Sequence, residues 1–297
     1  MANRKTILVT GAGYGIGKAA VSILLDLGHR VLLHDQRANL GVLERMVAVY
    51  GDLAEAYVAD LSRLPEVEKL ADAVRKKHTS LDVLINHDSR FLKNSSDNHT
   101  RGRKSHDERL MANTIAPYVL TKRMLPLLKS VKDSRVVNVS SWMAAPVSLR
   151  AMSGKGILGA RQAYSQSKLA LNMWTQHMAK KEKGVMIMAI RPSSLSDVEL
   201  SKLRDGTLVS SKLLDEDVRK GADALVRASF SGKFSLHLLA SGRFFDNQTQ
   251  RFHRTHATQT PERCEKVVQA IEKYLASHRM RMASLRQAQA AKQQESP

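Results

Sequence analysis

The chain has 297 residues, of which 43% are hydrophobic, so it is long enough for one large α/β domain or two small ones. Its one cysteine, Cys264, excludes a disulfide framework and every multi-cysteine metal site, and the 11 histidines show no metal-ligand spacing. A formal net charge of +19 favours a polyanionic partner or, as the simpler alternative, a solubilising surface without a specific partner.

Short apolar runs rich in β-branched residues alternate with helical patterns along the chain. Strands are predicted at 6–10, 30–34, 55–59, 82–86, 135–140, 185–190 and 235–240. These runs are nearly continuous, as in strands buried on both faces of a parallel sheet. The first strand begins too early to leave room for a signal peptide, so we expect a cytoplasmic or mitochondrial-matrix protein, not a secreted one. The longest uncharged run, 136–149, is too short to span a membrane.

Helices are predicted between these strands from apolar residues at i, i+3, i+4 and i+7. The first helix ends at Gly28 and has this spacing at Ala20, Ile23, Leu24 and Leu27. A later helix begins at Pro65 and repeats the spacing at Val67, Leu70, Ala71 and Val74. The alternation predicts a single doubly wound α/β domain with a parallel sheet of about seven strands, over residues 1–275. Residues 276–297 are basic and rich in Gln and Ala, and we expect them to form a mobile or partner-bound tail.

The segment TGAGYGIG, residues 10–17, directly follows the first strand and opens the first helix. Gly11 permits a tight turn, Gly15 lets the backbone approach a pyrophosphate, and Gly17 allows close packing of helix against strand. The helix N-terminus then offers N–H donors and a positive dipole to the anion. The alternative is a tight turn without a ligand.

The second strand ends in HDQR, residues 34–37. Asp35 is placed to accept hydrogen bonds from the adenosine ribose and would repel a 2′-phosphate, which favours NAD over NADP. Arg37 weakens this preference, and a helix-capping role for Asp35 is the alternative.

Tyr164 and Lys168 lie four residues apart in a predicted helix. A free tyrosine has a pKa of about 10 and is a poor base at neutral pH, but a lysine on the same helical face favours the phenolate. Such a pair is common by chance. Ser140 and Ser141 give it weight, because they end a strand whose carboxyl edge should face the cofactor crevice.

The motifs together, in this order, resemble those of the short-chain dehydrogenase/reductase family. They are TGAGYGIG (10–17), ADL (59–61), LDVLIN (81–86), MANTIAPYVLT (111–121), RVVNVSS (135–141), YSQSK (164–168) and IRP (190–192). The resemblance covers residues 4 to about 275, and the long separation of Ser141 from Tyr164 and the ending from residue 241 are similar to the retinol-dehydrogenase-like branch. It implies a Rossmann-type sheet in the order 3-2-1-4-5-6-7, with the crevice between strands 1 and 4.

The resemblance also implies roles for individual residues. Tyr164 would be the catalytic acid/base, Lys168 would bind the nicotinamide ribose and depress the tyrosine pKa, Ser141 would hold the substrate oxygen, and Asn113 would support a proton-relay water. The expected cofactor-binding residues are Thr10, Gly11, Gly15, Ile16, Gly17, Asp35, Asp60, Leu61, Asn86, Tyr164, Lys168 and Pro192.

Two segments depart from the family pattern. Where the family has Asn-Asn-Ala-Gly after the fourth strand, this chain has Asn86, His87, Asp88 and Ser89, which places a carboxylate beside the expected adenosine path. Where the family has Pro-Gly after the sixth strand, Ser193 follows Pro192, so a backbone-permissive position has gained a Cβ. Both changes bear on cofactor binding.

These observations leave two functions open. The first is an NAD-dependent oxidoreductase that interconverts a small, apolar alcohol and a carbonyl without a metal, with its substrate selected by loops 143–162 and 193–215. The second is a divergent member that serves as a basic structural or assembly subunit of a large RNA-containing complex, in mitochondria or elsewhere. A homo-oligomer is compatible with both. Candidate phosphate-contacting residues are Arg90, Lys93, Arg101, Arg103, Lys104, Arg279, Arg281, Arg286 and Lys292.

Overall fold

The predicted strands assemble into one sheet in the computed structural model, which describes residues 4–88, 107–156, 158–193, 211–230, 240–254 and 256–294. Within these residues the sheet has eight strands in the order β3-β2-β1-β4-β5-β6-β7-β8. β1 to β7 pair in parallel, and β8 is antiparallel to β7. The strands are β1 Thr6–Thr10, β2 Arg30–Asp35, β3 Ala54–Val58, β4 Val83–Asn86, β5 Ser134–Val139, β6 Val185–Arg191, β7 Phe244–Asp246 and β8 Arg251–His253.

The order of the first seven strands confirms the doubly wound fold that the sequence predicts. The number and position of the last strands differ from the prediction. Residues 235–239 of the expected final strand lie outside the described residues, and Ala240 is helical. The edge of the sheet is instead the three-residue pair β7 and β8. A strand of three residues is too short to show a hydrophobic period, which is why the sequence did not reveal it.

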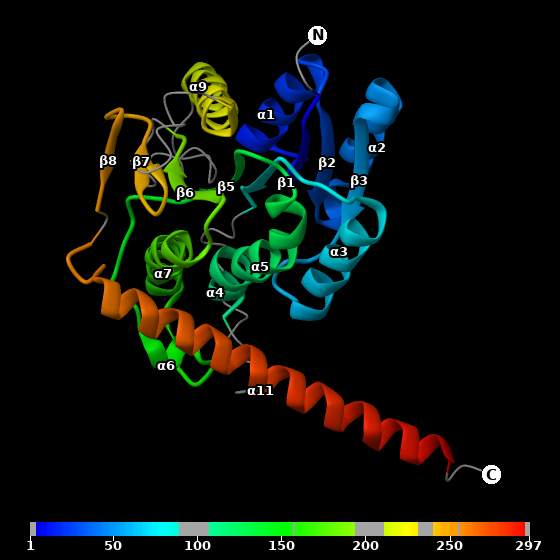
Figure 1. The fold of residues 1–297 in the computed structure, drawn as a ribbon, viewed down its shortest axis with the longest axis vertical. Helices are drawn as coiled ribbons and strands as arrows, with labels where there is room; N and C mark the ends of the chain where they lie inside the picture. The colour runs from blue at the N-terminus through cyan, green and yellow to red at the C-terminus, as the bar shows by residue number, and fades with distance from the viewer. Residues whose placement is uncertain are drawn as a thin grey trace.

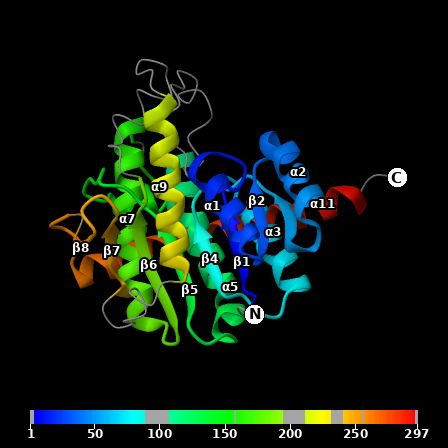
Figure 2. The same cartoon turned by 90° about the horizontal axis from the view of Figure 1, so that it is seen from above.

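Helices cover both faces of the sheet (Figure 1). On one face α1, α2 and α9 share a hydrophobic cluster, and α9 packs beside α1 (Figure 2). On the other face α3, α5 and α7 form a second cluster, to which α11 contributes. The helices are α1 Gly15–Asp26, α2 Leu40–Tyr50, α3 Leu64–Lys77, α4 Glu108–Leu110, α5 Ala116–Lys129, α6 Leu149–Met152, α7 Ala160–Lys181, α9 Ser211–Phe230 and α11 Pro261–Gln294, with a π-helical turn at Met111–Ile115 and 3₁₀ turns at Arg37–Asn39 and Gly51–Leu53.

The helix boundaries follow local signals in the sequence. Gly28 adopts a φ of 80° directly after α1, and its N–H donates to the carbonyl of Leu25, so the glycine satisfies a terminal carbonyl of the helix. Pro65 lies in the first turn of α3, as predicted. Leu27 is the exception among the predicted apolar positions. It is 57% exposed because α1 ends at Asp26 and Leu27 is its C-cap.

α11 runs along the outer side of α7 and extends past the body of the molecule (Figure 1). Its inner face buries Cys264, Val267, Ile271 and Leu275, and Glu272 accepts hydrogen bonds from Tyr118 and Lys122 of α5. The predicted boundary at residue 275 falls within this helix, which continues without a break to Gln294. The division into domain and tail stays a prediction.

In the described part of the chain, no helix combines the length and the apolar character that crossing a bilayer requires.

Candidate active site

The glycine-rich loop lies between the end of β1 and the start of α1. Gly11 and Gly15 adopt φ values of 73° and 50°, a backbone region that residues other than glycine rarely adopt. A Cβ on Gly17 would lie 2.1 Å from the carbonyl oxygen of Gly11, so this position must be glycine for the helix to approach the strand. A Cβ on Gly15 would meet nothing within 4 Å. The loop therefore has the geometry and the open space of a pyrophosphate cradle.

Asp35 is placed at the end of β2, as predicted, but its carboxylate faces inward and is fully buried. One oxygen, Oδ2, accepts a hydrogen bond of 2.7 Å from the N–H of Gly13. The other, Oδ1, accepts from the N–H of Gln36 at 2.7 Å and from Nδ2 of Asn39 at 2.8 Å. In this structure the carboxylate fixes the glycine-rich loop to β2 and to the residues before α2.

The carboxyl end of β4 lies against the same loop. The hydroxyl of Thr10 accepts hydrogen bonds from the N–H groups of His87 and Asp88, at 3.0 and 3.1 Å. The side chain of Asp88 is 5% exposed, and its Oδ1 accepts a hydrogen bond of 3.2 Å from the hydroxyl of Tyr14. This contact could not be predicted from the sequence, because Tyr14 and Asp88 are 74 positions apart.

Tyr164 and Lys168 lie on one face of α7, where they are 5% and 2% exposed. The lysine Nζ donates a hydrogen bond of 3.0 Å to the carbonyl of Val139, at the end of β5, and lies 5.8 Å from the centroid of the Tyr164 ring. Ser141 follows the same strand and is 2% exposed, and its hydroxyl accepts a hydrogen bond from the N–H of Met143. The fold thus brings the carboxyl end of β5 and the Tyr164–Lys168 face of α7 together.

Asn113 lies in the π-helical turn before α5, a feature that often marks functional positions in helices. Its Nδ2 donates a hydrogen bond of 3.1 Å to the hydroxyl of Ser167, which in turn donates to the carbonyl of Tyr164 at 2.6 Å. Thr114 in the same turn donates to the carbonyl of Ser167. These bonds fix the π-turn to the turn of α7 that carries Tyr164.

A buried amide chain supports the two central strands. Nδ2 of Asn86 donates to Oδ1 of Asn138 at 2.8 Å, and Nδ2 of Asn138 donates to the hydroxyl of Thr175 at 2.8 Å. Of these three residues, only Asn86 was expected from the sequence to belong to the site. The sequence also contained evidence that Asn138 is hydrogen-bonded. An amide side chain within the apolar run 135–140 is expected to be buried, and a buried amide needs hydrogen-bond partners.

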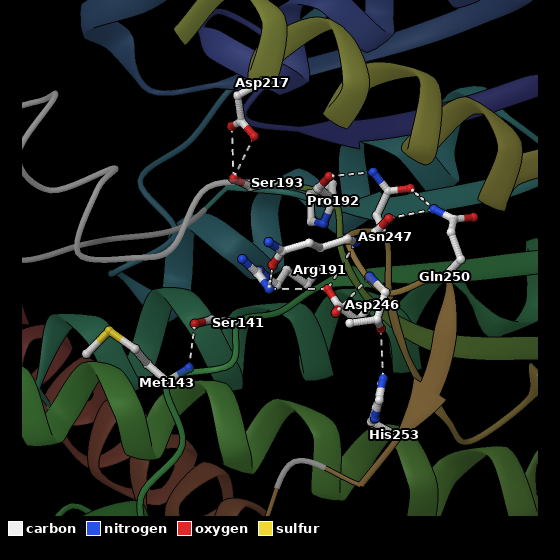
Figure 3. A network of polar contacts seen from close by, with 12 residues as sticks. Ser141, Met143, Arg191, Pro192, Ser193, Asp217, Asp246, Asn247, Gln250 and His253 are labelled. Atoms are coloured by element: carbon white, nitrogen blue, oxygen red, sulfur yellow. Dashed lines mark hydrogen bonds and ion pairs between the residues drawn. The ribbon is translucent and has the colours of Figure 1, made fainter. Parts of the chain in front are cut away.

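The segment after β6 is held by polar contacts that the sequence analysis also missed (Figure 3). The carbonyl of Pro192 accepts a hydrogen bond of 2.9 Å from Asn247. The hydroxyl of Ser193 donates to the carboxylate of Asp217, on α9, at 2.8 and 3.0 Å to its two oxygens. Ser193 and Asp217 are 6% and 1% exposed. The serine that replaces the family's glycine is therefore a fixed part of the fold.

Asp246 is a buried carboxylate beside this segment, at the end of β7 (Figure 3). Burial by itself raises the pKa of Asp246, but hydrogen bonds from Thr249 and Trp142 and the charge of Arg191 outweigh burial and lower it. Its Oδ1 lies 3.3 Å from Nη1 of Arg191. The carboxylate is thus held in its charged form.

The remaining predicted residues have structural partners. Oδ1 of Asp60 accepts hydrogen bonds from the N–H and the hydroxyl of Ser62, and Leu61 is 1% exposed within the core. Ile16 packs so closely against α9 that a Cβ on Gly221 would lie 2.6 Å from its Cδ1. Two residues that could have lined an apolar substrate site belong to the core or lie against it: Met152 is fully buried, and Leu149 packs on the same cluster. No group of three or more metal-ligating side chains occurs among the residues that the structure describes.

Comparison with known proteins identifies the family. The family model described as short chain dehydrogenase matches residues 5–205, more than half of the chain. The chain belongs to the short chain dehydrogenase family.

Similar sequences come from several kingdoms. An uncharacterized oxidoreductase of Bacillus subtilis, YmfI, is 29% identical over 198 residues, which are 64% of this chain and 75% of that protein. Retinol dehydrogenase 14 of mouse is 28% identical over 199 residues, 62% of this chain and 58% of that protein. A dehydrogenase/reductase of Arabidopsis thaliana, FEY, is 27% identical over 64% of this chain. The match spans only 54% of FEY, so it covers little more than half of the plant and mouse relatives. The retinol dehydrogenases support the branch that the sequence analysis identified.

Solved structures share the fold. The Pseudomonas aeruginosa RhlG/NADP active-site complex superposes with a TM-score of 0.61 at 21% identity, covering 83% of this chain and 95% of RhlG. An NADPH-bound carbonyl reductase from chicken fatty liver superposes with a TM-score of 0.60 at 24% identity, covering 84% of this chain and 99% of the reductase.

Proposed function

We propose that this protein interconverts an alcohol and a carbonyl compound by hydride transfer with a nicotinamide cofactor, and that Tyr164 is the acid/base. The observation that carries the proposal is the placement of Tyr164 and Lys168. Both side chains are nearly fully buried on one face of α7, and Nζ of Lys168 donates a hydrogen bond to the carbonyl of Val139 at the carboxyl end of β5, two residues before Ser141. Family membership supports an oxidoreductase.

We propose a separate role in the reaction for each residue. The cofactor, when bound, supplies or accepts the hydride. Ser141 holds the substrate oxygen, and Tyr164 donates a proton to that oxygen in reduction or removes it in oxidation. Lys168 lies 5.8 Å from the ring of Tyr164, so its ammonium charge stabilises the phenolate during the transfer.

Asn113 positions this apparatus. Its hydrogen bond to Ser167 fixes the backbone carbonyl of Tyr164, so its loss should displace the tyrosine even though the amide and the phenol belong to different helices. The role that the family resemblance implies, support of a proton-relay water by Asn113, is compatible with this arrangement and stays a prediction.

The residues of the crevice fit a dinucleotide at the pyrophosphate, where the glycine-rich loop is open above Gly15. We propose that NAD(H) is preferred to NADP(H), because the buried carboxylate of Asp35 places a negative charge at the end of β2, beside the expected position of the adenosine ribose, where it would repel a 2′-phosphate. Since its oxygens are occupied by Gly13, Gln36 and Asn39, Asp35 would act through its charge and through the shape of the glycine-rich loop. RhlG and the chicken reductase are named as NADP and NADPH complexes, respectively. The proposed preference of this chain for NAD(H) rests on Asp35 and differs from the cofactors named for those two structures.

The test is a titration of the purified protein with NADH and NADPH, followed by a screen of apolar alcohols and ketones. The wild type should bind NADH more tightly, and Asp35→Ala should narrow the difference. Tyr164→Phe should lose turnover. Tyr50→Phe is the matched control, because Tyr50 bonds Asp26 at the surface of α2. Tighter binding of NADPH would overturn the cofactor preference, and equal turnover by wild type and Tyr164→Phe would overturn the role of Tyr164.

The alternative function, a basic subunit of an RNA-containing complex, rests on charge. One of its two candidate groups, Arg90 to Lys104, lies outside the described residues. In the other group Arg279 and Arg281 are exposed on α11, and Arg279 lies 3.6 Å from Glu68. The relatives reported above are named as oxidoreductases or dehydrogenases, which favours the enzyme.

A further inference from the structure

Asp88 brings a negative charge to the glycine-rich loop, which would hold the anionic pyrophosphate in the proposed function. Its Cα lies 3.0 Å from the point where a Cβ on Gly11 would be, so the residue rests directly on the glycine-rich loop. Its N–H is fixed by Thr10. The side chain is 5% exposed, which leaves little solvent to screen its charge.

The carboxylate of Asp88 also reaches across the loop. It accepts a hydrogen bond from Tyr14, which is the residue directly before α1. The first turn of α1 contains no acidic residue of its own. The bridge therefore joins the carboxyl end of β4 to the N-cap of the helix whose N-terminus would receive the pyrophosphate.

We propose that Asp88 is a built-in competitor of the cofactor's pyrophosphate, and that the Tyr14–Asp88 hydrogen bond bridges the crevice beside the glycine-rich loop until a dinucleotide displaces it. The inference rests on the proposed function, because it assumes that a dinucleotide enters this crevice. Two anions in a poorly solvated cleft repel each other, and opening the bridge requires breaking a hydrogen bond to a charged group. Both effects weaken binding of the dinucleotide.

Two substitutions separate the effect of the Asp88 charge from the effect of its hydrogen bond with Tyr14. Asp88→Asn removes the charge but keeps an oxygen that accepts from Tyr14. Tyr14→Phe keeps the charge but removes the hydroxyl. Asp52→Asn is the control for net charge, since Asp52 is exposed in the turn before β3, at the amino ends of the strands, whereas Asp88 follows the carboxyl end of β4. Circular dichroism and the thermal unfolding midpoint establish that each variant is folded.

Three ligands show which part of the dinucleotide Asp88 affects. They are NADH, ADP and adenosine; ADP contains the pyrophosphate and adenosine lacks it. Binding is measured by fluorescence for NADH and by calorimetry for the other two. We expect Asp88→Asn to bind NADH and ADP at least about tenfold more tightly than the wild type, equivalent to about 1.4 kcal/mol. Adenosine should bind Asp88→Asn and the wild type equally. Tyr14→Phe should tighten NADH binding on the order of two- to tenfold, from the loss of one hydrogen bond. Asp52→Asn should change nothing.

Several outcomes would overturn the inference. Affinities of wild type and Asp88→Asn for ADP within twofold would exclude Asp88 as a competitor. An equal gain for adenosine would exclude repulsion of the pyrophosphate as the cause. These outcomes leave the proposed function intact if NADH binds and turnover depends on Tyr164. Failure of every variant, Asp88→Asn included, to bind NADH would instead reject the proposed function and the inference together.

Discussion

Replacing Asp35 by alanine should destabilise the whole fold as well as alter cofactor preference. The carboxylate is fully buried and accepts three hydrogen bonds, from the N–H groups of Gly13 and Gln36 and from the side chain of Asn39. Alanine removes both carboxylate oxygens, and with them all three hydrogen bonds. It also removes the side-chain hydrogen bond that holds Gly13 to the end of β2, while the bond from the N–H of Ala12 to the carbonyl of His34 stays, so the effect extends to the site itself.

The magnitude follows from where the three donors lie. A buried donor left without a partner costs about 1–3 kcal/mol. Gly13 is buried, so its N–H bears this cost in full, whereas Gln36 and Asn39 are partly exposed and recover hydrogen bonds with water. We therefore expect a loss of about 2–4 kcal/mol in the free energy of unfolding for Asp35→Ala. Asp35→Asn should be intermediate, because its amide group would oppose one of the donors.

The assay is urea unfolding, followed by far-UV circular dichroism and by tryptophan fluorescence. Asp52→Ala is the matched control, because it removes an exposed carboxylate and should change the free energy of unfolding by less than about 0.5 kcal/mol. A loss below about 1 kcal/mol for Asp35→Ala would refute the reasoning. It would mean that the carboxylate does not carry the hydrogen bonds that fix the loop.

Four further predictions concern chemistry, pH, the thiol and charge. Tyr164→Phe should abolish turnover and leave the NADH dissociation constant within a few-fold, whereas Lys168→Ala should impair both; a Lys168→Ala protein with normal binding and turnover would contradict this. Burial opposes the charge of Glu272, but hydrogen bonds from Lys122 and Tyr118 outweigh burial, so its pKa lies below the usual 4.5. A lowered pKa stabilises the fold above pH 4.5, and this stabilisation is lost as the pH falls through the folded-state pKa. Glu272→Gln should therefore lower the free energy of unfolding by about 1 kcal/mol at pH 7, after allowance for solvent screening, and by progressively less in urea titrations toward acid pH. A loss that does not depend on pH would refute the linkage. Burial raises the pKa of the Cys264 thiol to about 11, so at pH 8 iodoacetamide should alkylate the native protein far more slowly than the urea-unfolded chain, and equal rates would place the thiol at the surface. If the basic charge binds RNA, full-length protein should bind more tightly than a chain ending at Ser277, with a log–log salt slope of about 0.7 to 0.9 per phosphate contacted; weak binding indifferent to salt and truncation would indicate a solvated basic surface.

Much of the site could be predicted from the sequence because its requirements are local. Gly11 and Gly15 need positive φ values, and Gly17 needs the space at its Cα. Tyr164 and Lys168 share a face because they are four residues apart in a helix. The first six strands are apolar runs of four to seven residues, and their order followed from the motifs and was confirmed. For the glycines, the tyrosine–lysine pair and each single strand, the decisive interaction lies within one or two turns of chain, whereas the order of the strands was implied by the family resemblance.

Only the tertiary structure decided which side chains are partners. Asp35 was expected to face a ribose, yet its carboxylate turns inward to the N–H of Gly13, 22 residues away in the sequence. Asp88 meets Tyr14 across 74 residues, and Ser193 meets Asp217 across 24. A hydrogen bond requires its two heavy atoms to lie within about 3 Å, and the chain fixes such distances only after the sheet has brought its strands together. Residue type therefore predicted which positions could carry chemistry, and packing decided what each of them contacts.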